Sequence, residues 1–261
     1  MAYSNRSEIK YIVDIETFSR MKKDIDPFFE YDKKGGDNGK YIVSSIYYDS
    51  SDLRFYTEKI DGEKVRNKIR IRVYLDFKGK HRLIDLGELR SKNKILLEIK
   101  KRNNTNIVKN KLLMFEDEAQ KFLKNPSFID IEKYSEEERC ILSNIAYINS
   151  TYNLRPIVVI QYIRQAFLTK SFPRVRLTFD TILKCRSKNF YVHDLNLGNY
   201  FLEPSLGILE IKYNTSFPTW LSTLVKKYNL SQVTFSKYCT AIESIVNKNK
   251  YFINRSYSIQ F

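Results

Sequence analysis

The chain has 261 residues, of which 43% are hydrophobic and 14% aromatic, and its formal net charge is +15. These proportions exclude a globally disordered chain, because enough apolar side chains are present to form a packed core. No apolar run approaches the roughly 18 residues of a membrane span, so we expect a cytoplasmic protein without a membrane-inserted segment. The excess of positive charge predicts an anionic partner, such as nucleic acid, an acidic membrane surface or polyphosphate.

The predicted elements begin with a strand at residues 8–13 and a helix over 15–26, which Pro27 ends. The glycine cluster at 35–39 predicts a loop. Alternation of polar and apolar residues then predicts strands at 41–48, 65–76, 81–90 and 94–102. Ser50 or Ser51 is the expected N-cap of a short helix that runs to Tyr56.

Helical spacing predicts two further helices, at 109–124 and at 135–149, where acidic residues fill the first turn. The remaining expected elements are strands at 157–168, 173–181 and 207–213, a hairpin around 182–193, and helices at 217–227 and 235–248. We interpret the whole chain, residues 1–261, as one α+β domain dominated by antiparallel sheet.

Cysteine and histidine give little support for thiol or metal chemistry. Cys140, Cys185 and Cys239 lie far apart in the sequence, and we expect buried free thiols. His81 and His193 have no second His or Cys within a helical turn. This argues against a histidine metal centre and against a Ser/His/Asp triad.

Several predicted strands carry charged residues on one face. Residues two apart in a strand share a face, so the segment KIRIRVY places Lys68, Arg70 and Arg72 together. The same alternation aligns further charged pairs, namely Glu8 with Lys10, Glu98 with Lys100, Arg174 with Arg176, and Glu210 with Lys212, while Arg164 lies beside Tyr162. One polar face is ordinary in an antiparallel sheet. Six such strands together predict an anionic ligand, because like charges at this spacing repel one another.

The amphipathic helices need an apolar surface to cover, which predicts a closed antiparallel β-barrel with the helices outside and the charged faces inside. A lumen rich in Arg and Lys suits several phosphates in a row, because guanidinium groups bind phosphate oxygens bidentately. Glu8, Glu98 and Glu210 would then be metal ligands or would orient the basic residues. Mg²⁺ or Mn²⁺ is the expected ion, since both prefer carboxylate and phosphate oxygens.

These residues resemble the triphosphate tunnel metalloenzymes, a CYTH-like superfamily, and most closely its VTC catalytic domain, the polyphosphate polymerase branch. The resemblance rests on motifs that occur in order along nearly the whole chain: SEIKY, SSIYYDSSDLRFYTEK, KIRIRVY, LLEIKKR, YIRQAF, PRVRLTFDT, GILEIKY and FSKY. It implies an enzyme that transfers the γ-phosphate of ATP to a growing polyphosphate chain inside a basic tunnel, with a divalent metal ion.

The resemblance also implies roles for single residues, by motif position. Residues expected at the reaction are Lys10, Arg70, Arg72, Lys100, Arg164, Arg176 and Glu210. Further phosphate contacts are expected from Arg174, Lys109, Lys212, Ser236 and Lys237, with Glu8 and Glu98 beside them. Glu210 is the expected metal ligand, and Glu98 is expected to orient Lys100 or Arg72.

Two departures from the family pattern bear on the reaction. The hydrolase and cyclase relatives carry Glu-x-Glu-x-Lys in the first strand, whereas Arg6 stands at the position of the first Glu, which favours the polymerase branch. Thr234 stands where eukaryotic relatives have a lysine, which weakens the expectation of chain contacts there.

Two alternatives remain open: a tripolyphosphate or nucleoside triphosphate hydrolase of the same fold, and a non-catalytic polyanion-binding module. Nucleic acid is not an expected partner, because the aromatic residues fall on core positions and form no base-stacking motif. If product crosses a membrane, a separate membrane protein is expected to move it, with this chain at the inner face.

Overall fold

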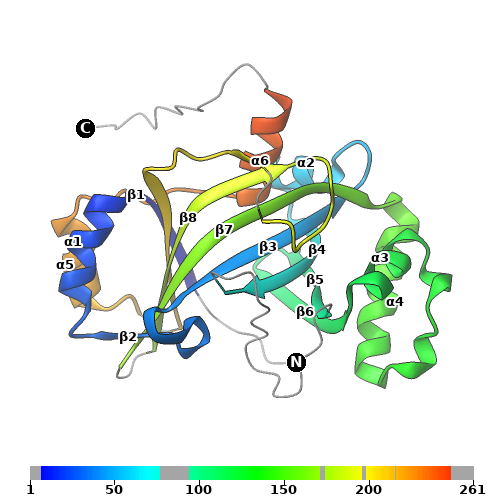
Figure 1. The fold of residues 1–261 in the computed structure, drawn as a ribbon, viewed down its shortest axis with the longest axis horizontal. Helices are drawn as coiled ribbons and strands as arrows, with labels where there is room; N and C mark the ends of the chain where they lie inside the picture. The colour runs from blue at the N-terminus through cyan, green and yellow to red at the C-terminus, as the bar shows by residue number, and fades with distance from the viewer. Residues whose placement is uncertain (1–6, 77–93, 171–173, 196–197, 215, 248–261) are drawn as a thin grey trace. The chain divides into compact units, whose positions relative to one another are not determined.

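The computed structural model describes residues 7–76, 94–170, 174–195, 198–214 and 216–247 (Figure 1). It divides into two compact units, which are treated separately below. The first unit contains Tyr41–Gln161 and Ser187–Asn196. The second contains Arg6–Lys40, Tyr162–Arg186 and Leu197–Phe261.

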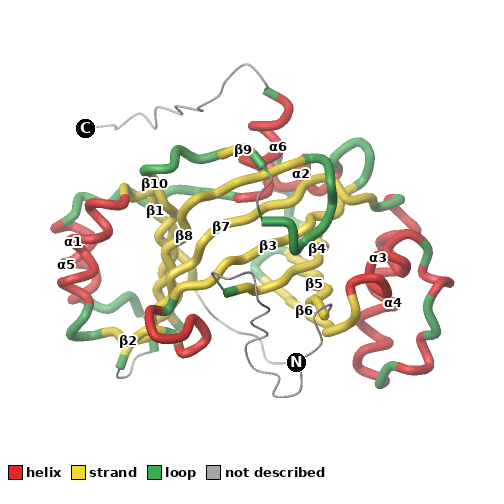
Figure 2. Tube along the Cα trace, viewed as in Figure 1, coloured by secondary structure: helices red, strands yellow, loops and turns green. Residues whose placement is uncertain are grey.

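Both units contain strands and helices, drawn yellow and red in Figure 2. The strands are β1 (Ser7–Asp14), β2 (Phe29–Tyr31), β3 (Lys40–Asp49), β4 (Val65–Leu75), β5 (Lys94–Asn103), β6 (Asn106–Phe115), β7 (Arg155–Thr169), β8 (Val175–Arg186), β9 (Asn199–Tyr200) and β10 (Leu206–Tyr213). The helices are α1 (Ile15–Ile25), α2 (Arg54–Ile60), α3 (Glu116–Lys124), α4 (Glu136–Tyr152), α5 (Thr219–Lys227) and α6 (Lys237–Val246), with short 3₁₀ helices at Lys33–Asn38, Pro126–Phe128 and Ile131–Lys133.

The described strands form one antiparallel sheet in the order β1-β10-β8-β7-β3-β4-β5-β6, with β2 beside β7 and β9 beside β8. This confirms the predicted α+β fold with a large antiparallel sheet. The order starts at β1 and ends at β6, so the hydrogen bonding of the described strands is not that of a closed barrel. A closed barrel would need a ladder that joins these two end strands.

The core of the first unit lies between the apolar face of its sheet and three helices. Ile69 and Ile71 of β4 and Leu97 of β5 are fully buried. Phe55 of α2, together with residues of α3 and α4 such as Phe122, completes this core. The alternation in β4 therefore leaves its charged residues on the opposite face.

The core of the second unit lies between β1, β8 and β10 and the helices α1 and α5, which pack on the same apolar face (Figure 1). Phe18 of α1 stacks on Phe179 of β8, with ring centroids 3.8 Å apart. Leu209 of β10 and Leu221 of α5 are fully buried in the same core. In both units, therefore, helices cover the apolar faces of the strands, as the sequence predicts.

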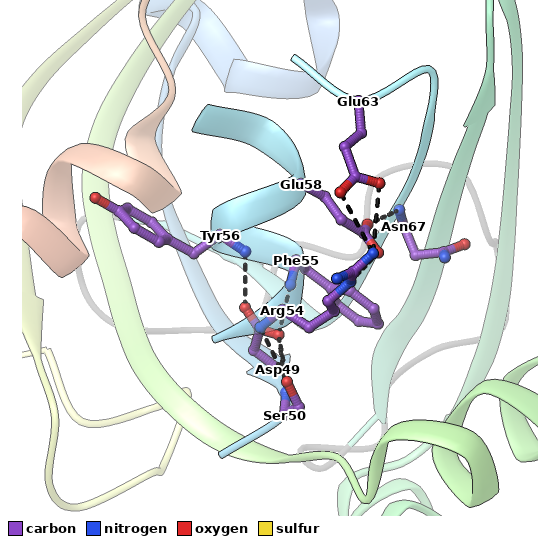
Figure 3. A network of polar contacts seen from close by, with 8 residues as sticks. All are labelled: Asp49, Ser50, Arg54, Phe55, Tyr56, Glu58, Glu63 and Asn67. Atoms are coloured by element: carbon purple, nitrogen blue, oxygen red, sulfur yellow. Dashed lines mark hydrogen bonds and ion pairs between the residues drawn. The ribbon is translucent and has the colours of Figure 1, made fainter. Parts of the chain in front are cut away.

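The expected N-cap of the short helix after β3 is wrong. This helix, α2, begins at Arg54, and the carboxylate of Asp49 organises its start (Figure 3). Asp49 is fully buried and accepts hydrogen bonds from the backbone N–H groups of Ser50, Phe55 and Tyr56, at 2.8, 2.8 and 3.0 Å. The Ser50 hydroxyl accepts only from the Arg54 N–H. A carboxylate satisfies several orphan backbone donors better than one hydroxyl does, because it offers two acceptor oxygens.

The helix predicted over 109–124 is correct only in its second half, because residues 106–115 form β6. Leu112 and Met114 alternate toward the core and pair with β5 in a hairpin. Burial of alternate residues and the β5 ladder together override the chance helical spacing.

Other expectations differ in detail. No hairpin forms at 182–193, because β8 continues to Arg186 and pairs with β9. The strand predicted at 81–90 lies outside the described residues. Cys185 and Cys239 are buried free thiols as expected, but Cys140 is exposed on α4. In the part of the chain that the structure describes, we find no helix with the length and hydropathy of a membrane span.

Replacing Gly207 in β10 tests the packing of the second core. A Cβ atom at this position would overlap the Phe179 ring and lie 3.0 Å from the Asp180 backbone oxygen. We therefore expect Gly207→Ala to lower the free energy of unfolding by about 2–3 kcal/mol, the upper part of the range for overpacking. The control is Gly62→Asn, because Gly62 has φ +73° and no atom near its Cβ position, and the loss there should be about 1 kcal/mol. Equal losses in denaturant titrations would contradict this packing.

Candidate functional site

The first group lies on the polar face of the first unit, and we call it the Arg70 cluster. It contains the predicted site residues Arg70, Arg72, Glu98 and Lys109, together with Tyr47, which the prediction of the site omitted. Arg70 pairs with Glu98 through Nε at 2.6 Å and Nη2 at 2.5 Å. Lys109 Nζ lies 3.2 Å from the other oxygen of Glu98. One buried carboxylate therefore serves two cations, and the cluster keeps a net positive charge.

Arg72 donates hydrogen bonds to neutral hydroxyl groups. Its Nε donates to the Ser45 hydroxyl at 3.0 Å, and its Nη1 donates to the Tyr74 hydroxyl at 3.4 Å. The residue is only 5% exposed. A guanidinium held at this depth by hydroxyl groups exerts a strong field on any ligand that reaches it.

Glu98 remains ionised in this cluster. Burial alone would raise the pKa of Glu98, but the charges of Arg70, Arg72 and Lys109 outweigh burial and hold that pKa well below its usual range. Glu98 forms ion pairs with Arg70 and Lys109, two residues that it can therefore orient. Its expected role in orienting Lys100 or Arg72 stays a prediction. Lys100 is exposed and lies opposite Lys109 in the β5–β6 ladder.

The second group lies in the second unit, and we call it the Glu210 cluster: Glu8, Lys10, Glu210 and Lys212. Antiparallel pairing of β1 with β10 sets Lys10 opposite Glu210 and Glu8 opposite Lys212. Lys10 Nζ lies 2.9 Å from Glu8 and 3.9 Å from Glu210, and Lys212 forms ion pairs with both carboxylates. The repeated Glu-Ile-Lys motif therefore forms one cross-strand square of alternating charge.

Burial tends to raise the pKa of Glu210, which is only 6% exposed. The charges of Lys212, Arg164, Lys237 and Lys10 outweigh burial and hold the pKa of Glu210 well below its usual range. Glu210 is therefore a carboxylate at neutral pH, and its oxygens are available as hard ligands.

The third group is centred on Asp180, a residue that the prediction of the site omitted. Asp180 is fully buried and binds Arg164 through two hydrogen bonds of 2.6 and 2.7 Å. Lys237, at the start of α6, lies 2.7 Å from the same carboxylate. Both cations also lie over the ring of Tyr162, at 5.3 and 4.9 Å from its centroid. The alternation of PRVRLTFD had already placed Asp180 on the same face as Arg176, and this was the signal that could have identified it.

Three further predicted residues, Arg174, Arg176 and Ser236, have different surroundings. Arg176 pairs with Asp32 at 2.8 Å, and sequence reasoning also missed this buried carboxylate. Arg174 is exposed just before β8. The hydroxyl of Ser236 accepts from the Cys239 N–H as the N-cap of α6, which gives it a structural use.

Glu8 and Glu210 could bind a divalent ion only together with further ligands, such as waters and substrate phosphates. Among the residues that the structure describes, no group of three or more Asp, Glu, His or Cys side chains is arranged to hold a metal. Glu8 and Glu210 share two lysine partners and offer carboxylate oxygens, the ligand type that Mg²⁺ and Mn²⁺ prefer. Mg²⁺ is commonly held by one or two carboxylates together with waters and substrate phosphates, and this donor set fits that mode.

Comparison with known proteins identifies the family to which the chain belongs. The sequence model described as "VTC domain" matches residues 5–246. No curated protein gives a significant match. A solved structure from Hippeastrum, a putative adenylyl cyclase (HpAC1) described as having a dominant triphosphatase activity, is 13% identical, with a TM-score of 0.51 over 91% of this chain and 95% of its own.

A putative adenylate cyclase from Bacillus halodurans is 16% identical, with a TM-score of 0.48 over 90% of this chain and 96% of its own. At 13% identity, the Hippeastrum structure speaks to the fold and not to the reaction. The family match is different in kind, because it spans most of the chain and includes the strands that carry all three clusters. This chain belongs to the VTC domain family.

Proposed function

We propose that this chain is a polyphosphate polymerase that transfers the γ-phosphoryl group of ATP to the end of a growing polyphosphate chain. An oxygen of the terminal phosphate forms the new bond to the γ-phosphorus, the bond from that phosphorus to the bridging oxygen breaks, and ADP leaves. The observation that carries the proposal is the half-buried Arg70 and the buried Arg72 beside a single carboxylate, in a member of the VTC domain family. Its partners are then ATP and polyphosphate, not nucleic acid.

The Arg70 cluster can supply what phosphoryl transfer most requires. The reaction passes through a loose transition state, so positioning and charge neutralisation provide most of the rate. Arg70 and Arg72 would bind the phosphate oxygens, since their guanidinium groups are fixed by Glu98, Tyr47 and Ser45 before any ligand arrives. Preorganised donors avoid the cost of reorganisation during the reaction.

The Glu210 cluster would hold the divalent ion, Mn²⁺ or Mg²⁺, through Glu210 with Glu8 beside it. When bound, such an ion neutralises phosphate charge and polarises the phosphorus–oxygen bonds. Lys10 and Lys212 now neutralise these carboxylates, and both side chains would turn toward substrate phosphates once an ion binds there.

Hydrolysis of tripolyphosphate or of a nucleoside triphosphate is the second candidate. The Hippeastrum structure of similar fold is described as a triphosphatase, and that reaction differs only in that water replaces the acceptor phosphate. Incubation of the purified protein with ATP and Mn²⁺, followed by separation of the products, distinguishes the two. Long acid-labile chains support the polymerase, and free phosphate without chains supports the hydrolase. If neither product forms while tripolyphosphate still binds, the protein is a polyanion-binding module.

Glu210→Gln tests the role of the carboxylate. We expect synthesis to be abolished, because a neutral amide oxygen binds a divalent cation more weakly than a charged carboxylate does. Affinity for tripolyphosphate should stay within about threefold of wild type, because losing a negative charge beside Lys10 and Lys212 does not weaken attraction of an anion. Calorimetric binding and product assays measure the two effects. Glu203→Gln, at an exposed position of the same unit, is the control, and retained synthesis in Glu210→Gln would exclude this role.

Arg72→Ala tests the phosphate site of the first unit. We expect tripolyphosphate to bind at least about tenfold more weakly, since a buried charge-assisted contact is lost. Lys33→Ala removes an exposed lysine and should change the affinity by less than about twofold. Because Arg72 is buried, its variant is compared with wild type by melting temperature, and Arg72→Lys, which keeps the charge, should recover part of the affinity. Similar losses in both alanine variants would indicate diffuse attraction instead of a site.

A further inference from the structure

Tyr47 of β3 is a buried phenol inside the Arg70 cluster. It is only 3% exposed, and the β3–β4 ladder sets it directly opposite Arg70. Its oxygen accepts a hydrogen bond from Arg70 Nη1 at 3.1 Å. Arg70 is in turn opposite Glu98 in the next ladder. The three side chains therefore form one row across three strands.

This row accounts for all three nitrogens of the Arg70 guanidinium. Nε and Nη2 face Glu98, and Nη1 faces Tyr47. A guanidinium held on two sides keeps one orientation, and its remaining N–H bonds point away from both partners. Glu98 holds Arg70 as an ionised carboxylate, whereas Tyr47 can hold it either as a neutral phenol or as a charged phenolate.

Cations dominate the surroundings of Tyr47. From β4, Lys68 Nζ and Arg70 Cζ lie 5.6 and 5.7 Å from its ring centroid, and the charge of Arg72 also acts on its oxygen. From β5, Glu98 is the facing acid, and it is already paired with Arg70.

The other neighbours of Tyr47 add little charge. Two residues along β3, the Asp49 carboxylate is occupied by backbone N–H groups of α2. On its other side β3 adjoins β7, and residues 156–160 of β7 (PIVVI) contain no titratable group. The phenol oxygen therefore experiences mainly positive charge.

This environment favours the phenolate form. Burial would raise the pKa of Tyr47, but the charges of Arg70, Arg72 and Lys68 outweigh burial and lower that pKa to about 7. Tyr74, which accepts from Arg72, is shifted in the same direction: burial opposes the shift, and Arg72 contributes most to lowering the pKa to about 8.

We propose that Tyr47 is a positioning residue that holds Arg70 for the phosphate chain and takes up a proton when that chain binds. The inference rests on the proposed function, because it takes Arg70 as a phosphate ligand. In the empty site a phenolate balances the excess positive charge. A bound phosphate brings its own negative charge, repels the phenolate and raises its proton affinity.

The sign of the pH dependence follows from linkage. Proton uptake on binding means that tripolyphosphate affinity falls as the pH rises from the pKa of Tyr47 in the empty site toward its higher value in the complex. The positive charges of the site favour fully ionised phosphates, so the ligand itself can release protons on binding but does not take them up. Protons taken up at pH 8.5 therefore come to groups of the protein.

The experiment uses the full chain, with inorganic tripolyphosphate as the probe and Tyr47→Phe as the variant. The near-ultraviolet absorbance of tyrosinate in wild type should show a titration step below that of ordinary tyrosines, whose pKa is about 10. Tripolyphosphate should shift the part of this step near pH 7 to higher pH, and Tyr47→Phe should lack that part while it keeps the part near pH 8 that belongs to Tyr74. Tyr147→Phe, which removes the hydroxyl of a 73% exposed tyrosine in the same unit, should leave the step unchanged.

Calorimetry at pH 8.5 in buffers of different ionisation enthalpy then counts protons. Wild type and Tyr147→Phe should take up about one proton more per tripolyphosphate than Tyr47→Phe does. A purely structural hydroxyl would change affinity or melting temperature without changing this number.

The outcomes separate this inference from the proposed function. Binding with equal proton uptake in wild type and Tyr47→Phe overturns the role of Tyr47 and leaves the phosphate site intact. A wild-type titration without the early absorbance step overturns it as well. If wild type fails to bind tripolyphosphate at all, the proposed function fails and the coupling fails with it.

Discussion

The structure depends on how cations are kept on the polar faces of its strands. Arginines and lysines on neighbouring strands repel one another, and burial makes the repulsion stronger. Buried carboxylates lie between them: Glu98 is shared by Arg70 and Lys109, and Asp180 is shared by Arg164 and Lys237. Each of these carboxylates neutralises only part of the charge that surrounds it. These carboxylates therefore reduce the repulsion while an excess of positive charge remains on the polar faces.

The apolar faces of the same strands provide the rest of the stability. In each unit, helices cover the side of the sheet that carries Ile, Val, Leu and Phe. Because side chains alternate along a strand, covering one face commits every second residue to the other. The positions of Arg70 and Arg72 are thus fixed by burial of Ile69 and Ile71. Binding chemistry and core packing arise from a single pattern.

That pattern is why much of the fold and of the site could be predicted from the sequence. Alternation identified most of the strands and the residues that share a face, including both members of each Glu-x-Lys pair. It could not identify Asp32, because this residue lies outside a strand and meets Arg176 from a distant part of the chain. It also failed at residues 109–115, where Leu112 suits a helix and a strand equally well. Only pairing with β5 decides that case.

The α2 connection in Figure 3 has a consequence for strand alignment. Asp49 ends β3, and Glu58 of α2 accepts a hydrogen bond from the Asn67 N–H at 3.3 Å, near the start of β4. The helix therefore fastens both strands at the point where the chain passes from one to the other. If β4 slipped by a single residue, its arginines would enter the apolar core and its isoleucines would lie on the polar face. By fixing the register of β4 against β3, α2 keeps each side chain of β4 on its own face of the sheet.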